Sequence, residues 1–182
     1  MRVSIVGSGY VGLVSGAGLS DVGHHVVCMD IDRDRVAGLR NGVVPIYEPG
    51  LESMISRNAA QGRLEFTTDI EQAVEHAEVL FIAVGTPPGE DGSADLSHVR
   101  AVADAVGSCL RRPLLVVVKS TVPVGTGDEV EEIIRKKRPD GTIPTREELL
   151  ATNLKITDLV ANDTRRALDH EHTWMSEHLE TP

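Results

Sequence analysis

The sequence RVSIVGSGYVG, residues 2–12, places a short apolar run directly before three glycines with the spacing G-x-G-x-x-G. The apolar run predicts a buried strand, and the small, apolar residues that follow the glycines predict a helix. Gly7 permits the tight turn between the two, Gly9 lets a phosphate approach the backbone, and Gly12 lets the helix pack close to the strand. This stretch therefore predicts a strand, a turn and a helix whose N-terminus faces a phosphate group.

The ligand that this pattern predicts is a dinucleotide. The helix N-terminus offers N–H groups and a partial positive charge to a pyrophosphate, and we expect Tyr10 and Val11 to donate from their backbone. Asp30 stands at the end of the next predicted strand, where a carboxylate accepts the ribose hydroxyls of NAD and repels the 2′-phosphate of NADP. The sequence thus favours NAD. The alternative is that Asp30 only caps a helix that starts near Asp32.

Strands and helices alternate along the chain as far as about residue 137. Thr68 and Glu71 have the spacing of a capping box, which predicts a helix start at Thr68. Alternation with short links predicts right-handed βαβ units, and hence a Rossmann-like, doubly wound α/β fold with about five parallel strands. We expect residues 1–137 to form this dinucleotide-binding domain. After the first strand, further strands are expected over 24–30, 64–67, 78–84 and 113–120.

Three polar residues outside the glycine turn are candidate cofactor contacts. Thr86 and Thr121 follow the fourth and fifth predicted strands, and ligands collect at the carboxyl ends of strands in such sheets. Arg35 lies one turn into the helix after Asp30, within reach of the adenosine end. The alternatives are that the two threonines only form turns and that Arg35 is a solvated surface side chain.

The character of the sequence changes after Lys137. Residues 138–182 form a polar tail, and the capping-box spacing of Thr145 and Glu148 predicts that it is helical. Three histidines in this tail, His170, His172 and His178, raise the alternative of a metal site. However, His170 and His172 do not share a helix face. We therefore expect a solvated tail, an atypical extension of the domain, and no metal.

Composition excludes several classes of protein. The formal net charge is −10 over 182 residues, which argues against nucleic acid and against an anionic membrane surface as partners. No apolar stretch approaches the roughly 20 residues of a membrane span. The two cysteines, Cys28 and Cys109, do not have a metal-binding or redox spacing. We expect a cytoplasmic protein, and the sequence leaves open a homo-oligomer.

Five segments stand in a characteristic order along the chain: GSGYVGLVSG, VVCMDIDRDRV, GVVPIYEPGLE, VGTPPGEDGSADLSHV and KSTVPVGTGD. Together they resemble one family, the UDP-glucose/GDP-mannose dehydrogenases. The resemblance covers the NAD-binding N-terminal domain, about residues 1–137 here, and PIYEPGLE and GEDGSADL are most similar to the UDP-glucose 6-dehydrogenase branch.

The resemblance implies an NAD-dependent oxidation of UDP-glucose to UDP-glucuronate in two steps. It also implies that Val11, Asp30, Arg35, Thr86 and Thr121 contact the cofactor. Thr121 in addition resembles the threonine that helps to position a catalytic water near the substrate.

The sequence also departs from the family. The segments that carry the family's catalytic lysine and cysteine are absent, and Cys28 and Cys109 have the setting of small core residues. We therefore expect a truncated, NAD-binding portion of such an oxidoreductase. We expect it to have no efficient turnover on its own, and to have UDP-glucose as a partner only in the intact family context. The alternative is a stand-alone NAD- or nucleotide-binding regulatory module whose tail docks a partner.

Overall fold

The computed structural model describes residues 1–89 and 92–137. The tail expected over 138–182, with its capping box and its histidines, lies outside the described residues.

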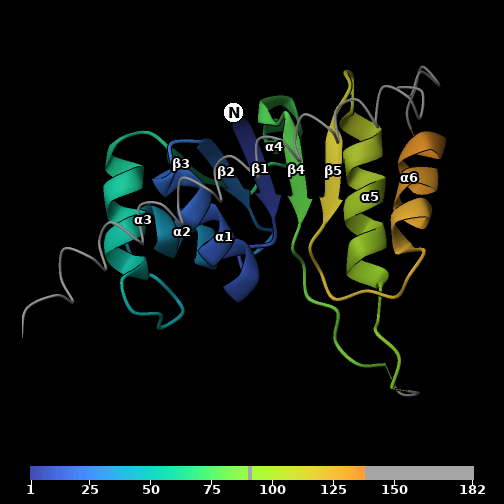
Figure 1. Ribbon diagram of the computed structural model, residues 1–182, viewed down its shortest axis with the longest axis horizontal. Coiled ribbons are helices and arrows are strands. Elements are labelled where there is room, and N and C mark those ends of the chain that lie inside the picture. Colours follow the sequence, from blue (N-terminus) through green and yellow to red (C-terminus); the bar gives the residue numbers. More distant parts are fainter. Residues whose placement is uncertain (90–91, 138–182) are drawn as a thin grey trace, which may run out of the picture. The chain divides into compact units, whose positions relative to one another are not determined.

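Strands and helices alternate as the sequence predicts (Figure 1). All strand pairs are parallel, and the sheet order is β3-β2-β1-β4-β5. This confirms the Rossmann-like, five-stranded parallel sheet. The strands are β1 (Arg2–Val6), β2 (His25–Met29), β3 (Leu64–Thr67), β4 (Val79–Ile82) and β5 (Leu115–Val118). The helices are α1 (Tyr10–Asp21), α2 (Arg33–Arg40), α3 (Leu51–Ala60), α4 (Ile70–His76), α5 (Ser97–Cys109) and α6 (Thr126–Lys137).

The helices cover both faces of the sheet, so most strand residues are apolar and buried, with Ser4 in β1 and the exposed Glu65 in the edge strand β3 among the exceptions. On one face, the residues of α1, α2 and α3 pack against alternate strand residues such as Ile5 and Cys28. On the other face, α4, α5 and α6 pack against the remaining strand residues, among them Val6 and Ile82. The core is mainly aliphatic, which agrees with the aromatic content of 3%, and Phe66 is a buried aromatic residue on the face covered by α1, α2 and α3.

The start of α4 differs from the prediction. The N-cap is Asp69, whose Oδ1 accepts hydrogen bonds from the backbone N–H groups of Glu71 (2.9 Å) and Gln72 (3.3 Å). The capping box predicted at Thr68 is therefore wrong by one position. Aspartate is as good an N-cap as threonine or better, and the spacing of the glutamate alone does not distinguish the two.

Helix α5 packs closely against α6. A Cβ added to Gly107 would lie 2.9 Å from the Ile134 carbonyl oxygen, so the two helices approach more closely than a side chain at that position allows. Ion pairs join them as well, from Arg100 to Glu129 and from Lys137 to Asp104. This packing matters for function because α5 forms one wall of the cleft described below.

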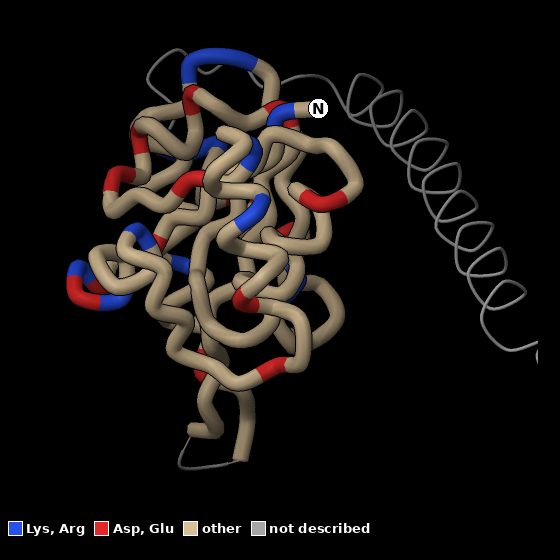
Figure 2. Tube along the Cα trace, turned by 90° about the vertical axis from the view of Figure 1, so that its left-hand side faces the viewer, with Lys and Arg blue, Asp and Glu red and all other residues tan. Residues whose placement is uncertain are grey.

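Acidic and basic residues are interspersed along the described chain in the view of Figure 2. Within the described ranges, no helix has the length and apolar character needed to cross a bilayer.

A polar network centred on the buried Asn58 ties α1 and α3 to Arg63, which directly precedes β3. Asn58 is fully buried; its Nδ2 donates to Asp21 Oδ1 (3.0 Å) and to the Met54 carbonyl (2.9 Å). Its Oδ1 accepts from Arg63 Nε (3.0 Å) and Nη2 (2.6 Å). Hydrogen bonds from Arg57 and Asn58 hold the pKa of Asp21 below its usual value. The amide of Asn58 thus donates a hydrogen bond to the carboxylate of Asp21 and accepts hydrogen bonds from the guanidinium of Arg63.

We predict that Asn58→Ala lowers the free energy of unfolding by about 2–4 kcal/mol, because partly buried charged groups lose their hydrogen-bond partners. Urea-induced unfolding followed by circular dichroism measures this. Asn41→Ala is the matched control, since its exposed amide donates only to the Ala37 carbonyl and its loss is expected to cost less than about 1 kcal/mol. Equal effects of the two substitutions would contradict the role assigned to the network.

Candidate functional site

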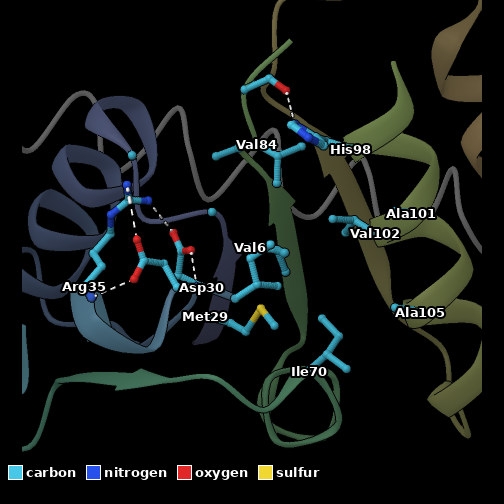
Figure 3. Close-up of a pocket in the computed structure, with 16 residues that line it drawn as sticks. Val6, Met29, Asp30, Arg35, Ile70, Val84, His98, Ala101, Val102 and Ala105 are labelled. Carbon is cyan, nitrogen blue, oxygen red and sulfur yellow. Dashed lines mark hydrogen bonds and ion pairs between the residues drawn. The ribbon is translucent and has the colours of Figure 1, made fainter. Parts of the chain in front are cut away.

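A cleft of about 570 Å³ opens at the carboxyl ends of β1, β2 and β4. The strand order reverses at this point. β2 and β3 lie on one side of β1, and the next strand in the chain, β4, lies on the other side. Such a switch point separates neighbouring loops and leaves a crevice in which α/β proteins bind ligands. Figure 3 shows Asp30 and Arg35 on one side of the cleft and α5 on the other, with Val6 and Met29 between them.

The glycine turn connects β1 to α1 at the edge of this cleft. Gly7 has a φ of +103°, and a Cβ on Gly7 would lie 2.8 Å from the Ala83 carbonyl oxygen. A Cβ on Gly12 would overlap the carbonyl oxygen of Gly7. Two of the three glycines are therefore required by the protein itself, one by the turn and one by the contact between helix and strand.

Gly9 is different because its surroundings are open. A Cβ added to Gly9 would have no atom of the described chain within 4 Å, and Gly9 lines the cleft. It is also the N-cap of α1, with an extended backbone conformation that any residue adopts. No close contact within the described chain requires a glycine at this position, and the missing side chain leaves room for a ligand. This open space at Gly9, here called the Gly9 cradle, agrees with the sequence prediction that a pyrophosphate approaches the backbone at the second glycine, and the contact itself stays a prediction.

Tyr10 and Val11 begin α1, with half-exposed side chains. The first helical hydrogen bond after the N-cap runs from the Leu13 N–H to the Gly9 carbonyl (2.9 Å), so the N–H groups of Tyr10 and Val11 precede it. Such first-turn N–H groups have no partner within the helix and are suited to bind an anion. The Tyr10 hydroxyl donates to Glu48 Oε2 (2.7 Å), a contact that ties the turn to the loop before α3.

Asp30 stands directly after β2 and faces the cleft. Its Oδ2 accepts from the Ser8 N–H (2.7 Å) and from Arg35 Nη1 (3.1 Å), and its Oδ1 accepts from the Asp32 N–H (3.0 Å). The helix cap proper is Asp32, whose Oδ1 accepts from the N–H groups at the start of α2. The carboxylate of Asp30 therefore does more than start a helix, because it also joins the glycine turn to the end of β2 and lines the cleft.

Thr86 and Thr121 come together at the carboxyl ends of β4 and β5. The Thr86 hydroxyl donates to the Thr121 carbonyl (3.0 Å). Neither threonine is among the described residues that line the cleft. The residue before Thr86, Gly85, does line it. The structure thus brings the two residues to each other, while their contact with a cofactor remains a prediction.

Sequence reasoning missed the apolar wall of the cleft and one histidine. Ala101, Val102 and Ala105 present one face of α5 to the cleft, and Ile70 contributes from the start of α4. His98 lines the same wall, and its Nδ1 lies 3.2 Å from the Gly85 carbonyl oxygen (Figure 3). The spacing of the two alanines marks a helix face, but only the tertiary packing shows that this face borders the cleft.

The two cysteines have the buried character expected of them. Burial raises the pKa of the Cys28 thiol to about 12. Cys109 is half-buried on α5, and burial together with the charge of Glu71 raises its pKa. Neither lines the cleft within the described chain, so neither has the setting of a reactive thiolate.

A parallel sheet with a glycine turn at its switch point and a carboxylate at the end of the neighbouring strand defines a dinucleotide-binding domain. Comparison with known proteins identifies the family. The sequence profile of the UDP-glucose/GDP-mannose dehydrogenase family, NAD binding domain, matches residues 1–166, and the chain belongs to this family. The match extends past the boundary that we expect near residue 137.

Individual relatives agree with this assignment. The chain is 57% identical over 135 residues to UDP-glucose 6-dehydrogenase of Pseudomonas aeruginosa, a match that covers 74% of the chain and 30% of that enzyme. It is 48% identical over 166 residues to the UDP-glucose 6-dehydrogenase of Rhizobium meliloti, covering 90% of the chain and 38% of the relative. A solved UDP-glucose dehydrogenase of Pyrobaculum islandicum superposes with a TM-score of 0.74 at 45% identity, over 78% of this chain and 34% of that one. The chain therefore spans about a third of the length of these relatives.

Gly9 and Gly12 give opposite predictions although both belong to one motif. We expect Gly9→Ala to change the free energy of unfolding by less than about 1 kcal/mol, since its Cβ meets no described atom. The same substitution is expected to weaken NAD binding about tenfold or more, a loss of at least about 1.4 kcal/mol, because the Cβ takes the place of the pyrophosphate.

Gly12→Ala is the matched variant. Its Cβ overlaps the Gly7 carbonyl, so we expect the free energy of unfolding to fall by about 1–3 kcal/mol even without cofactor. Thermal unfolding and calorimetric titration with NAD separate the two effects. A Gly9→Ala protein that binds NAD as tightly as the wild type would contradict the cradle.

Proposed function

We propose that residues 1–137 hold NAD for the oxidation of a nucleotide sugar, and that the sugar is that of UDP-glucose. The observation that carries the proposal is the open cradle at Gly9 beside the Asp30 carboxylate in the switch-point cleft. The membership of an NAD-binding family and the names of the relatives support the cofactor and the sugar respectively.

In this proposal the chain's own residues bind and orient the cofactor. The N–H groups of Tyr10 and Val11 face the pyrophosphate, and Asp30 accepts from the ribose hydroxyls with the lone pairs that its protein donors leave. Arg35 lies beside the adenosine half. The apolar wall of α5 offers a surface for the adenine ring and keeps water from it. NAD itself supplies the hydride acceptor.

Thr86 and Thr121 are proposed contacts for the part of the cofactor nearest to the substrate. Their hydrogen bond fixes the ends of β4 and β5 relative to each other. Thr121 is also proposed to position a water near the sugar, as the family resemblance implies.

Turnover by these 182 residues alone is expected to be inefficient. The resemblance implies a thiolate that traps the oxidised sugar, and the sequence offers only two cysteines, both shielded by packing. Both are free, which fits the reducing cytoplasm that we expect as its location.

Asp30→Ala tests the cofactor site. We expect calorimetric titration to show NAD binding weakened by about 1–3 kcal/mol, because the ribose hydroxyls lose a charged acceptor. Asp21→Ala is the control: this carboxylate also holds an arginine and an N–H donor, but it lies at the far end of α1. Unchanged NAD affinity in Asp30→Ala, or an equal loss in Asp21→Ala, would contradict the site.

A kinetic assay tests the reaction. With NAD and UDP-glucose, we expect the 182-residue protein to form NADH at a rate far below the typical enzyme range of about 1–1000 per second. A rate within that range would show that the chain carries a nucleophile that we have not assigned. Failure of the wild-type protein to bind NAD at all would contradict the proposed function.

A further inference from the structure

We propose that His98 recognises the base of the bound dinucleotide, and that it selects adenine over a purine with an oxo group at the 6-position. The inference rests on the proposed function, because it concerns which base the NAD-binding cleft accepts. It adds base selectivity to a cleft whose other proposed polar contacts are to the phosphates and the ribose.

The cleft contains apolar surface suited to a flat ring. Ala101 and Ala105 lie about one turn apart on the face of α5 that lines the cleft, and both side chains are small. Ile31, directly after Asp30, lines the same cleft and is 85% exposed. A ring that covers these side chains removes apolar surface from water, so the base of a dinucleotide whose ribose lies at Asp30 packs against them.

His98 stands at the end of this apolar strip of α5. It precedes Ala101 by three residues and Ala105 by seven, so the three side chains share one helix face. Of the α5 residues that line the cleft, His98 is the polar one, and Figure 3 shows it beside the end of β4. Its side chain is exposed, so a ligand in the cleft can reach the ring.

The contact with Gly85 determines which ring nitrogen accepts a hydrogen bond. The Nδ1 atom of His98 lies 3.2 Å from the Gly85 carbonyl oxygen. Because a carbonyl oxygen only accepts, Nδ1 carries the hydrogen and donates, and Nε2 of the neutral ring is then an acceptor. Nε2 has no hydrogen-bond partner among the described residues. The cleft therefore offers an acceptor whose tautomer is fixed by a backbone carbonyl.

An acceptor at this place distinguishes purines by the substituent at the 6-position. The 6-amino group of adenine donates a hydrogen bond, whereas the 6-oxo group of hypoxanthine only accepts. The lone pair of Nε2 accepts from the amino group and repels the oxo group, which also loses a hydrogen bond to water. Since His98 is exposed and water competes for both groups, we expect a moderate discrimination.

The test is calorimetric titration of the full chain, in mildly alkaline buffer, with NAD and with nicotinamide hypoxanthine dinucleotide. The two ligands differ in the base alone. We expect the wild type to bind NAD about three- to tenfold more tightly. His98→Phe keeps a flat ring but removes both nitrogens, and we expect it to lose most of this preference.

His98→Gln is the second variant. Its amide presents either an oxygen or an N–H group to the base, so it can serve both substituents. We expect the preference to fall here because binding of the hypoxanthine ligand improves, while the affinity for NAD stays close to that of the wild type.

His76→Phe is the matched control. The Nε2 atom of His76 also lies near a backbone carbonyl, that of His25 (3.0 Å), but His76 ends α4 beside the start of β2 and does not line the cleft. The preference for NAD is expected to be unchanged in this variant. Thermal unfolding shows which variants are folded, and if His98→Phe is not, His98→Gln decides the test.

The outcomes separate the two proposals. A wild-type protein that fails to bind NAD contradicts the proposed function. If the wild type binds both dinucleotides equally, or if the folded His98 variants keep the full preference, only the present inference is overturned. An equal loss of preference in His76→Phe also overturns it, because the effect would then not come from the histidine in the cleft.

Discussion

The contact on which the site depends is the one between the Gly7 carbonyl and the bare Cα of Gly12. Because no side chain separates them, α1 begins immediately beside the end of β1 and its first turn lies at the edge of the cleft. The hydrogen bond from the Ser8 N–H to Asp30 then holds the turn against the end of β2. Helix, turn and carboxylate are thereby fixed relative to one another by one backbone contact and one hydrogen bond, so this edge of the cleft is formed by the chain itself.

Much of this fold could be predicted from the sequence, for a specific reason. Strands such as β1 and β4 are apolar on both faces, the links between elements are short, and parallel strands joined by helices have one favoured handedness. The boundaries were less predictable. The predicted strand over 113–120 is β5 with bounds Leu115–Val118, and the cap of α4 is Asp69 rather than Thr68. Local patterns do not distinguish adjacent polar residues that compete for the same N–H groups.

The candidate site divides into residues that the sequence identifies and residues that it does not. Gly7, Gly9, Gly12 and Asp30 are identified because backbone geometry and one charge dictate them at fixed spacing. The wall formed by α5 is not, since alanine and valine on a helix face are equally suited to any core contact. Which face of α5 borders the cleft is set by its packing with the sheet, α4 and α6, contacts that join residues far apart in the chain.

The strand order also has a consequence for how this protein folds during synthesis. β1 pairs with β2 on one side, but its other neighbour is β4, which is made only after α3, β3 and α4. The first strand therefore leaves the ribosome with both edges unpaired. β2 can cover one edge soon afterwards, but the other stays available to wrong partners until residues 79–82 arrive. The residues of one side of the cleft, the glycine turn and Asp30, are synthesised before those of β4 and α5 on the other side. Pairing over such sequence separations is slow, so the centre of the sheet is completed late although its first strand is made first.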